Sequence, residues 1–111
     1  MVRRVKITGA RGRWVAEVEG RMLAVLHSTH MQPGGQLFAP FDDGDPRGRA
    51  RYEEFQEALR NHELVVIQRD RSATDFTRNG YVGVFRFSDL EIDYASGISL
   101  RLTERYADPA P

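Results

Sequence analysis

Residues 14–26 of the chain, WVAEVEGRMLAVL, contain two apolar segments separated by Glu19 and Gly20. In the first segment, apolar residues at positions 14, 16 and 18 alternate with charged residues at positions 13, 17 and 19, the pattern of a β-strand with one buried face. Gly20 lies where this pattern resets and favours a tight hairpin turn. The second segment, residues 22–26, is apolar throughout and predicts a central strand covered on both faces.

Further strands are predicted on both sides of this hairpin. Upstream, Val5 and Ile7 alternate with Arg4 and Lys6. Downstream, short apolar or alternating segments rich in β-branched and aromatic residues follow. Together with the hairpin, these segments predict about six strands, over residues 5–7, 14–18, 22–26, 64–67, 80–87 and 98–103.

One amphipathic helix is predicted between residues 45 and 62. Asp45 and Pro46 are typical of an N-cap followed by proline at the first helical position, and Gly48 moves the expected start of the helix to about Arg49. At 100° per residue, one set of side chains forms an apolar stripe about 120° wide. The stripe consists of Tyr52, Phe55, Ala58, Leu59 and His62.

The order of these elements predicts the fold class. Three strands, a long loop over residues 32–48, the helix, one strand, a second long loop over residues 68–79 and two strands indicate an α+β fold. We expect a twisted, mostly antiparallel sheet with the helix between its third and fourth strands, and partial closure into a barrel is compatible with this order. Residues 1–106 are expected to form a single domain, and residues 107–111 a flexible tail.

Composition excludes several classes of function. The 16 basic and 16 acidic residues cancel, so a strongly basic nucleic-acid-binding domain is excluded and only a local basic patch remains. The absence of cysteine excludes disulfides, thiolate nucleophiles and cysteine-ligated metals. There is no leader pattern and no apolar segment long enough to cross a bilayer, so we expect a cytoplasmic protein without a membrane partner.

The second long loop combines arginine with aromatic residues, which together can hold phosphate and stack on a base. The turn at residues 9–12 is expected to contribute further arginines and a stacking indole if it lies on the same side of the sheet. Alternatively, the charges form local salt bridges and Trp14 and Phe76 pack in the core. The ligand-binding candidates are Arg11, Arg13, Trp14, Arg69, Arg71, Phe76, Arg78 and Tyr81.

His27 and His30 are candidates for a metal site, which would need a third ligand such as Asp42, Asp43 or Asp45. Residues i and i+3 of a strand face opposite sides, so the spacing predicts one packed histidine and one exposed histidine. We therefore expect neither a metal nor a cofactor.

Three functional hypotheses follow from these features. The first is a small intracellular binding module without catalytic activity, which holds nucleic acid or another anionic ligand on residues 69–81 and on the loop over residues 33–45. The second is a small hydrolase or nuclease with His27 or His30 as acid or base. The third is a structural domain that forms a homodimer through an edge strand or the outer face of the helix.

Overall fold

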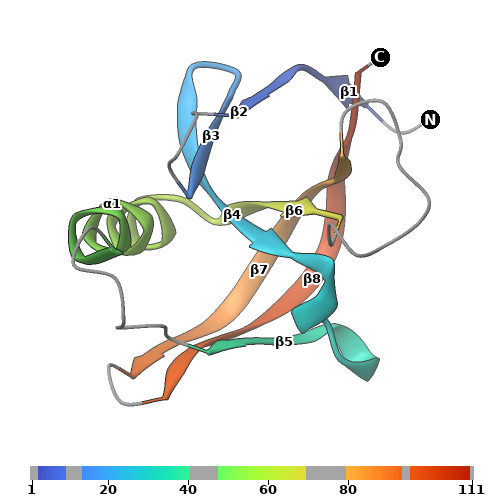
Figure 1. Ribbon diagram of the computed structural model, residues 1–111. Coiled ribbons are helices and arrows are strands. Elements are labelled where there is room, and N and C mark those ends of the chain that lie inside the picture. Colours follow the sequence, from blue (N-terminus) through green and yellow to red (C-terminus); the bar gives the residue numbers. More distant parts are fainter. Residues whose placement is uncertain (1–2, 10–13, 41–47, 70–79, 94–95, 111) are drawn as a thin grey trace.

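The computed structural model describes residues 3–9, 14–40, 48–69, 80–93 and 96–110 (Figure 1). The side chains of residues 48–51 lie outside this description. The elements, in chain order, are β1 (Arg4–Val5), β2 (Ile7–Gly9), β3 (Val15–Val18), β4 (Arg21–His27), β5 (Gln36–Pro40), α1 (Gly48–Asn61), β6 (Leu64–Gln68), β7 (Tyr81–Asp93) and β8 (Gly97–Pro109). Short 3-10 turns cover Ser28–His30 and Pro33–Gly35. No helix in the described ranges is long and apolar enough to cross a membrane.

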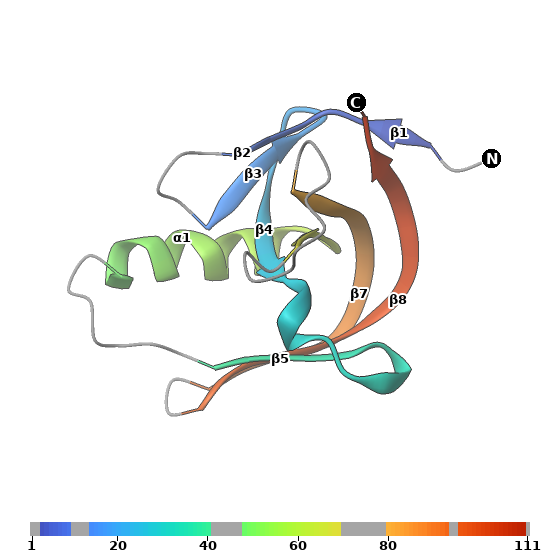
Figure 2. The ribbon, with the colours of Figure 1, turned by 45° about the vertical axis from the view of Figure 1, so that its right-hand side comes forward.

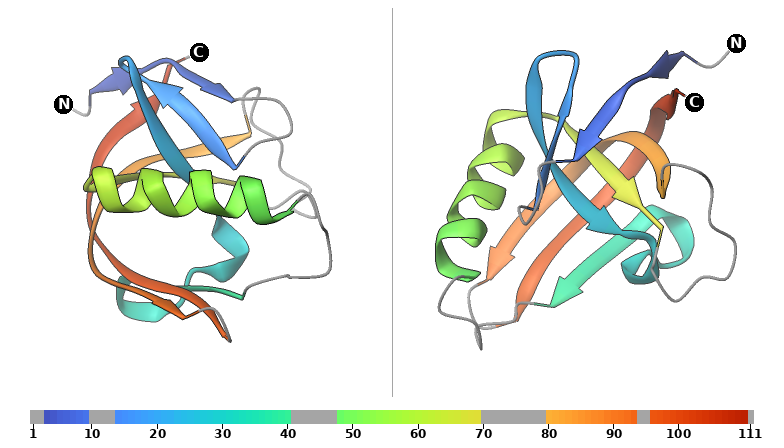
Figure 3. Two further views of the ribbon diagram at one scale, coloured as in Figure 1. Left: turned by 90° about the vertical axis from the view of Figure 1, so that its left-hand side faces the viewer. Right: turned by 45° about the horizontal axis from the view of Figure 1, so that its top comes forward.

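The strands form a mixed sheet that nearly closes into a barrel. Hydrogen-bonded neighbours follow the order β1-β8-β7-β6-β4-β3-β2, and Lys6 alone separates the two end strands in the chain. The N-terminal segment therefore joins both edges of the sheet, as Figures 1 and 3 show. β5 lies off this path and pairs with the first part of β8. The predicted α+β class and the partial closure into a barrel are confirmed.

Two finer predictions about the sheet were wrong. The described residues contain eight strands instead of about six, and α1 follows the fifth strand instead of the third. The sheet is mixed: five of the strand pairs in the described residues are antiparallel, as the prediction of a mostly antiparallel sheet requires, and two pairs, β4–β6 and β1–β8, are parallel. β4 and β6 run parallel because the long connection between them, through β5 and α1, returns the chain to the same end of the sheet.

β5 lies in a segment that we predicted to be a loop. Its proline and glycine neighbours suggested irregular chain, but Leu37 is buried while Gln36 and Phe38 on either side are exposed. β5 pairs with β8 alone, apart from a single bridge between Met31 and Leu37. Pro40 is tolerated because it ends a strand at the border of the sheet, where a proline removes no central hydrogen bond.

The predicted hairpin and the two-sided central strand are confirmed. β3 and β4 pair from Val18 and Arg21 onwards, and Glu19 and Gly20 between them have φ values of 52° and 78°, the positive values of a type I′ turn. Along β4, Leu23 faces one apolar cluster and its neighbour Ala24 faces another.

The two apolar clusters lie on opposite sides of β4 and β6. The first fills the interior of the barrel and includes Leu23, Val66 and Val84, all fully buried. The second lies on the outer face of β4 and β6, where α1 packs mainly against β4 (Figure 2), and it also includes Leu37 of β5 and Ile98 and Leu100 of β8. Four residues of the predicted helical stripe, Tyr52, Phe55, Ala58 and Leu59, are buried in this second cluster.

The end of the chain differs from the expected flexible tail. β8 continues to Pro109, and Ala107 is fully buried in the barrel interior. Arg4 pairs with Asp108, and the Asp108 N–H donates to the carbonyl of Arg3 at 2.8 Å. Backbone pairing with β1 therefore orders this segment, although its own side chains have little tendency to form a strand.

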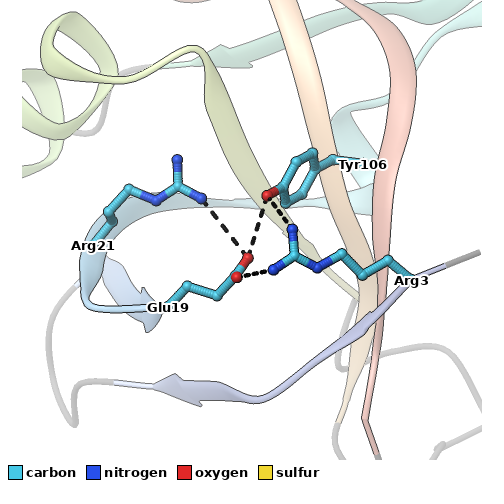
Figure 4. A network of polar contacts seen from close by, with 4 residues as sticks. All are labelled: Arg3, Glu19, Arg21 and Tyr106. Atoms are coloured by element: carbon cyan, nitrogen blue, oxygen red, sulfur yellow. Dashed lines mark hydrogen bonds and ion pairs between the residues drawn. The ribbon is translucent and has the colours of Figure 1, made fainter.

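A network of polar side chains lies where β1 pairs with β8 and nearly closes the barrel (Figure 4). Arg3 donates to the Tyr106 hydroxyl at 2.8 Å and forms an ion pair with Glu19, while the Tyr106 hydroxyl donates to Glu19 Oε1 at 3.3 Å. Arg21 lies 3.8 Å from the same oxygen, Glu19 Oε1, whereas Arg3 contacts Oε2. The network links β1, the β3–β4 turn and β8, and thereby ties the first strand to the rest of the barrel.

Candidate functional site

One end of the barrel collects the ends of β2, β4 and β6 and the beginnings of β3 and β7. His27 pairs with Gln68, and Gln68 pairs with Tyr81. The N–H of Val25 donates to the carbonyl of Trp14 at 2.9 Å. Gly9, the last residue of β2, pairs with Ala16, the second residue of β3. We call this end, defined by Gly9, Trp14, His27, Gln68 and Tyr81, the barrel mouth.

Tyr81 spans the inside of the barrel mouth. Side chains of paired residues on neighbouring strands share a face, so His27, Gln68 and Tyr81 form a row toward the interior. A Cβ placed on Gly9 would lie 2.5 Å from the Tyr81 hydroxyl, which shows that this hydroxyl occupies the space beside Gly9 on β2. Glycine at this position thus makes room for the tyrosine. Burial raises the pKa of Tyr81 above its usual value of 10.0.

We expect Tyr81 to ionise above the usual range of tyrosine. The chain has four tyrosines, so the absorbance change of phenolate formation should be measured in the wild type and in Tyr81→Phe and then subtracted. The difference should have its midpoint above pH 10.0, because burial penalises the phenolate. The unfolded chain then loses this proton first, so the free energy of unfolding should fall above pH 10 more steeply in the wild type than in the variant. A midpoint at or below 10.0 would show that Tyr81 is solvated.

An aromatic cavity lies beside the barrel mouth, on the outer side of the wall. Its volume is about 230 Å³, and it opens between the ends of β4 and β5 and the first half of α1. The residues lining it are Trp14, Val25, Leu26, His27, His30, Ala39, Pro40, Tyr52, Phe55 and Ile98. Among these described residues there is no carboxylate, and the lining residues other than His27 and His30 are aliphatic, aromatic or proline.

Three aromatic rings give the cavity its shape. The indole of Trp14 stands nearly perpendicular to Tyr52, at 6.5 Å and 81° between ring planes, and to Phe55, at 6.0 Å and 90°. These are favourable edge-to-face contacts. Trp14 nevertheless stays 36% exposed, so it is both packed against the core cluster and accessible to a ligand.

His27 and His30 both border this cavity, and both are half-buried. β4 ends at His27 and Ser28–His30 form a 3-10 turn, so the two positions do not share one strand as the prediction assumed. Alternation along β4 places the His27 side chain on the interior face with Leu23 and Val25. Within the described part of the chain, no three histidine or acidic side chains are grouped to hold a metal. Asp42, Asp43 and Asp45, the expected third ligands, lie outside the described residues.

The predicted ligand-binding residues are described in part. Trp14, Arg69 and Tyr81 lie at the barrel mouth or directly beside it, and the Arg69 N–H donates to the carbonyl of Gly80 at 2.8 Å. The chain therefore leaves and re-enters the fold at the barrel mouth on both sides of segment 70–79, and it does so again at Gly9 and Trp14 on both sides of segment 10–13. The remaining candidates, Arg11, Arg13, Arg71, Phe76 and Arg78, lie outside the described residues.

Several arginines elsewhere on the surface form local ion pairs. Arg86 lies 3.0 Å from Glu104, Arg105 lies 2.7 Å from Asp108, and Arg101 lies 3.6 Å from Asp89. Arg3 and Arg21 likewise form ion pairs with Glu19. Local salt bridges thus account for these arginines without a ligand.

The sequence did not identify Tyr52 and Phe55 as residues of a site. Their helical spacing assigned them to the core, where they do pack, but the same rings also line the cavity. One feature of the sequence did indicate a site: the helix follows a segment predicted to be a long loop, and it carries two aromatic residues in its first turns.

Comparisons with protein-family models, with curated proteins and with solved structures find no match to this chain. The function is therefore argued from the barrel mouth and the aromatic cavity themselves.

Proposed function

We propose that this protein is a non-catalytic binding module that holds nucleic acid at the barrel mouth. The observation that carries the proposal is the position of the aromatic cavity beside the four points, at Gly9, Trp14, Arg69 and Gly80, that border the two arginine-containing segments. Ligand sites concentrate on loops that connect elements of a rigid scaffold, and the residues that flank both segments lie at one end of the barrel.

The chemistry of the residues supports an anionic ligand with rings. By sequence, segments 10–13 and 70–79 carry Arg11, Arg13, Arg71 and Arg78 against Asp70 and Asp75, a local excess of positive charge in a chain whose net charge is zero. Arginine binds phosphate through paired N–H donors, and aromatic faces stack on bases. Arginines in segments whose flanking residues lie near an aromatic cavity thus match, by residue type, the two parts of a nucleotide.

The lining of the cavity favours binding over hydrolysis. Proton transfer by histidine is usually supported by a carboxylate that orients the imidazole or by a metal that activates water. His27 and His30 share the cavity with aromatic and aliphatic side chains, and the described lining contains no acidic residue. This arrangement suits hydrogen bonding to a ligand better than it suits acid–base catalysis.

The test is the affinity for a fluorescently labelled single-stranded oligonucleotide, measured by anisotropy between 50 and 200 mM salt. We expect binding that weakens as salt rises, because phosphate contacts release counterions. The double variant Arg71→Ala/Arg78→Ala should bind more weakly, and the slope of log affinity against log salt should fall by about 1.4, the value for two lost contacts to a single strand.

The matched control is Arg60→Ala/Arg101→Ala, which removes the same charge from α1 and β8. It should leave both affinity and slope nearly unchanged, since Arg60 is at the far end of α1 from the cavity and Arg101 is paired with Asp89. Salt-independent binding, equal losses in the two double variants, or no binding at 50 mM salt would each refute the proposed function.

A further inference from the structure

We propose that the aromatic cavity takes a single unpaired nucleobase, with Trp14 as its stacking face and His30 at its hydrogen-bonding edge. This inference rests on the proposed function and deepens it, because it specifies which part of the nucleic acid enters the protein.

The size of the cavity fits one planar ring system. A dry protein cavity of about 150 Å³ is large enough to hold benzene. At about 230 Å³, this cavity has room for a ring somewhat larger than benzene, although not for two stacked bases. Most cavities that bind drug-sized molecules start at about 300 Å³, so the volume points to a small, flat group.

The walls of the cavity fit a ring as well. Trp14 is 36% exposed and already makes edge-to-face contacts with Tyr52 and Phe55, so a further ring can pack against an indole that is fixed in place. Val25, Leu26 and Ile98 supply aliphatic surface. Aromatic and apolar walls of this kind hold bases that have left the helical stack.

His30 gives the cavity a polar edge. An imidazole offers one donor and one acceptor when it is neutral, and the edge of every nucleobase carries donors and acceptors. His30 lies in the 3-10 turn that follows β4 and lines the cavity. A base can form a hydrogen bond with this imidazole, whereas a purely hydrocarbon ring cannot.

The base must be unpaired. In a duplex the base faces are stacked and the edges are paired, and the cavity lies between elements of the fold instead of on a flat surface. Only a base outside the stack can therefore reach Trp14. Such a base occurs in single-stranded nucleic acid, and the same ring chemistry occurs in a free nucleotide.

Trp14 is the only tryptophan of the chain, so its fluorescence reports on the cavity directly. The wild-type protein should be titrated with a single-stranded oligonucleotide, the corresponding duplex, an oligomer of the same length that carries sugar and phosphate without bases, and a free nucleoside monophosphate. We expect the single strand to quench the fluorescence, and the duplex and the base-free oligomer to bind with salt-dependent affinity and little quenching.

The variant Trp14→Ala should lower the affinity for the single strand by about 5- to 150-fold, the range for loss of one stacked base, and should leave the affinity for the base-free oligomer nearly unchanged. The matched control is Phe38→Ala. Phe38 is an aromatic residue of similar exposure, 38%, on β5, and its side chain does not line the cavity. Its loss should change neither affinity by more than about twofold.

The outcomes separate the two proposals. If the single strand, the duplex and the base-free oligomer bind equally well and Trp14 fluorescence stays constant, the inference is wrong while the proposed function stands. Quenching by the free nucleotide alone would support the inference and refute nucleic-acid binding, whereas quenching by the strand alone would support both. Absence of binding to all four probes would refute both.

Discussion

Replacing Gly97 by alanine should lower the free energy of unfolding by about 2 to 5 kcal/mol. Gly97 begins β8 with a φ of 142°, a conformation that residues with a side chain rarely adopt. A Cβ at this position would overlap the carbonyl oxygen of Ala39 and lie 2.9 Å from the Cα of Pro40. Both are backbone atoms of β5, so no side-chain rotation can relieve the overlap.

The control for this substitution is Gly34→Ala. Gly34 also has positive φ, 82°, but a Cβ there would meet no atom within 4 Å. This variant should lose only about 1 to 2 kcal/mol, the cost of the backbone conformation alone. Both free energies of unfolding are measured by urea denaturation, with the requirement that the slope of free energy against urea concentration is the same in the variants and the wild type. Equal losses in the two variants would mean that β5 moves away from β8 at little cost.

The glycine prediction also bears on the site, because β5 carries part of the cavity. Ala39 and Pro40 line the cavity and lie directly across from Ile98 and Gly97. Any shift of β5 away from β8 would therefore widen the cavity at the wall opposite Trp14. The contact between β5 and Gly97 thus contributes both to stability and to the shape of the proposed binding site.

The sequence predicted those parts of the fold that depend on neighbouring residues. The hairpin around Gly20, the two-sided strand β4 and the stripe of α1 follow from local alternation, turn chemistry and helical periodicity. The prediction failed where strands pair over long distances in the chain. Nothing local to Arg4 or Asp108 indicates that they pair, and β5 is held in the sheet by β8, about 60 residues later.

The candidate site was predicted in the same uneven way. Trp14 was identified because an aromatic residue beside arginines suggests stacking, and the structure places it on the cavity. The 3-10 turn that carries His30 was missed because it depends on where β4 ends, a boundary that apolar alternation locates poorly. Tyr52 and Phe55 were missed as site residues because one face of a helix can serve the core and a cavity together.

Substituting Leu23 by alanine should be the most destabilising of the leucine truncations, with a loss of about 3 to 5 kcal/mol. Leu23 is fully buried in the interior of the barrel, where it packs in one cluster with Val18, Val66 and Val84. The strands around it are held in a hydrogen-bonded ring that the N-terminal segment nearly closes. Such a wall cannot move inward to fill the space, and the cost of a truncation increases with the cavity that remains.

Leu59→Ala is the matched comparison, because it removes the same atoms from a residue that is 1% exposed. Leu59 belongs to the cluster between α1 and the barrel wall, and a helix that packs against a sheet through side chains alone can shift to close a gap. Its loss should be smaller, about 2 to 3 kcal/mol, at the lower end of the range for leucine truncations. Both values come from urea denaturation under the same conditions. Equal losses of stability in Leu59→Ala and Leu23→Ala would contradict this prediction. They would mean that the barrel wall adjusts to a missing side chain as readily as the helix does.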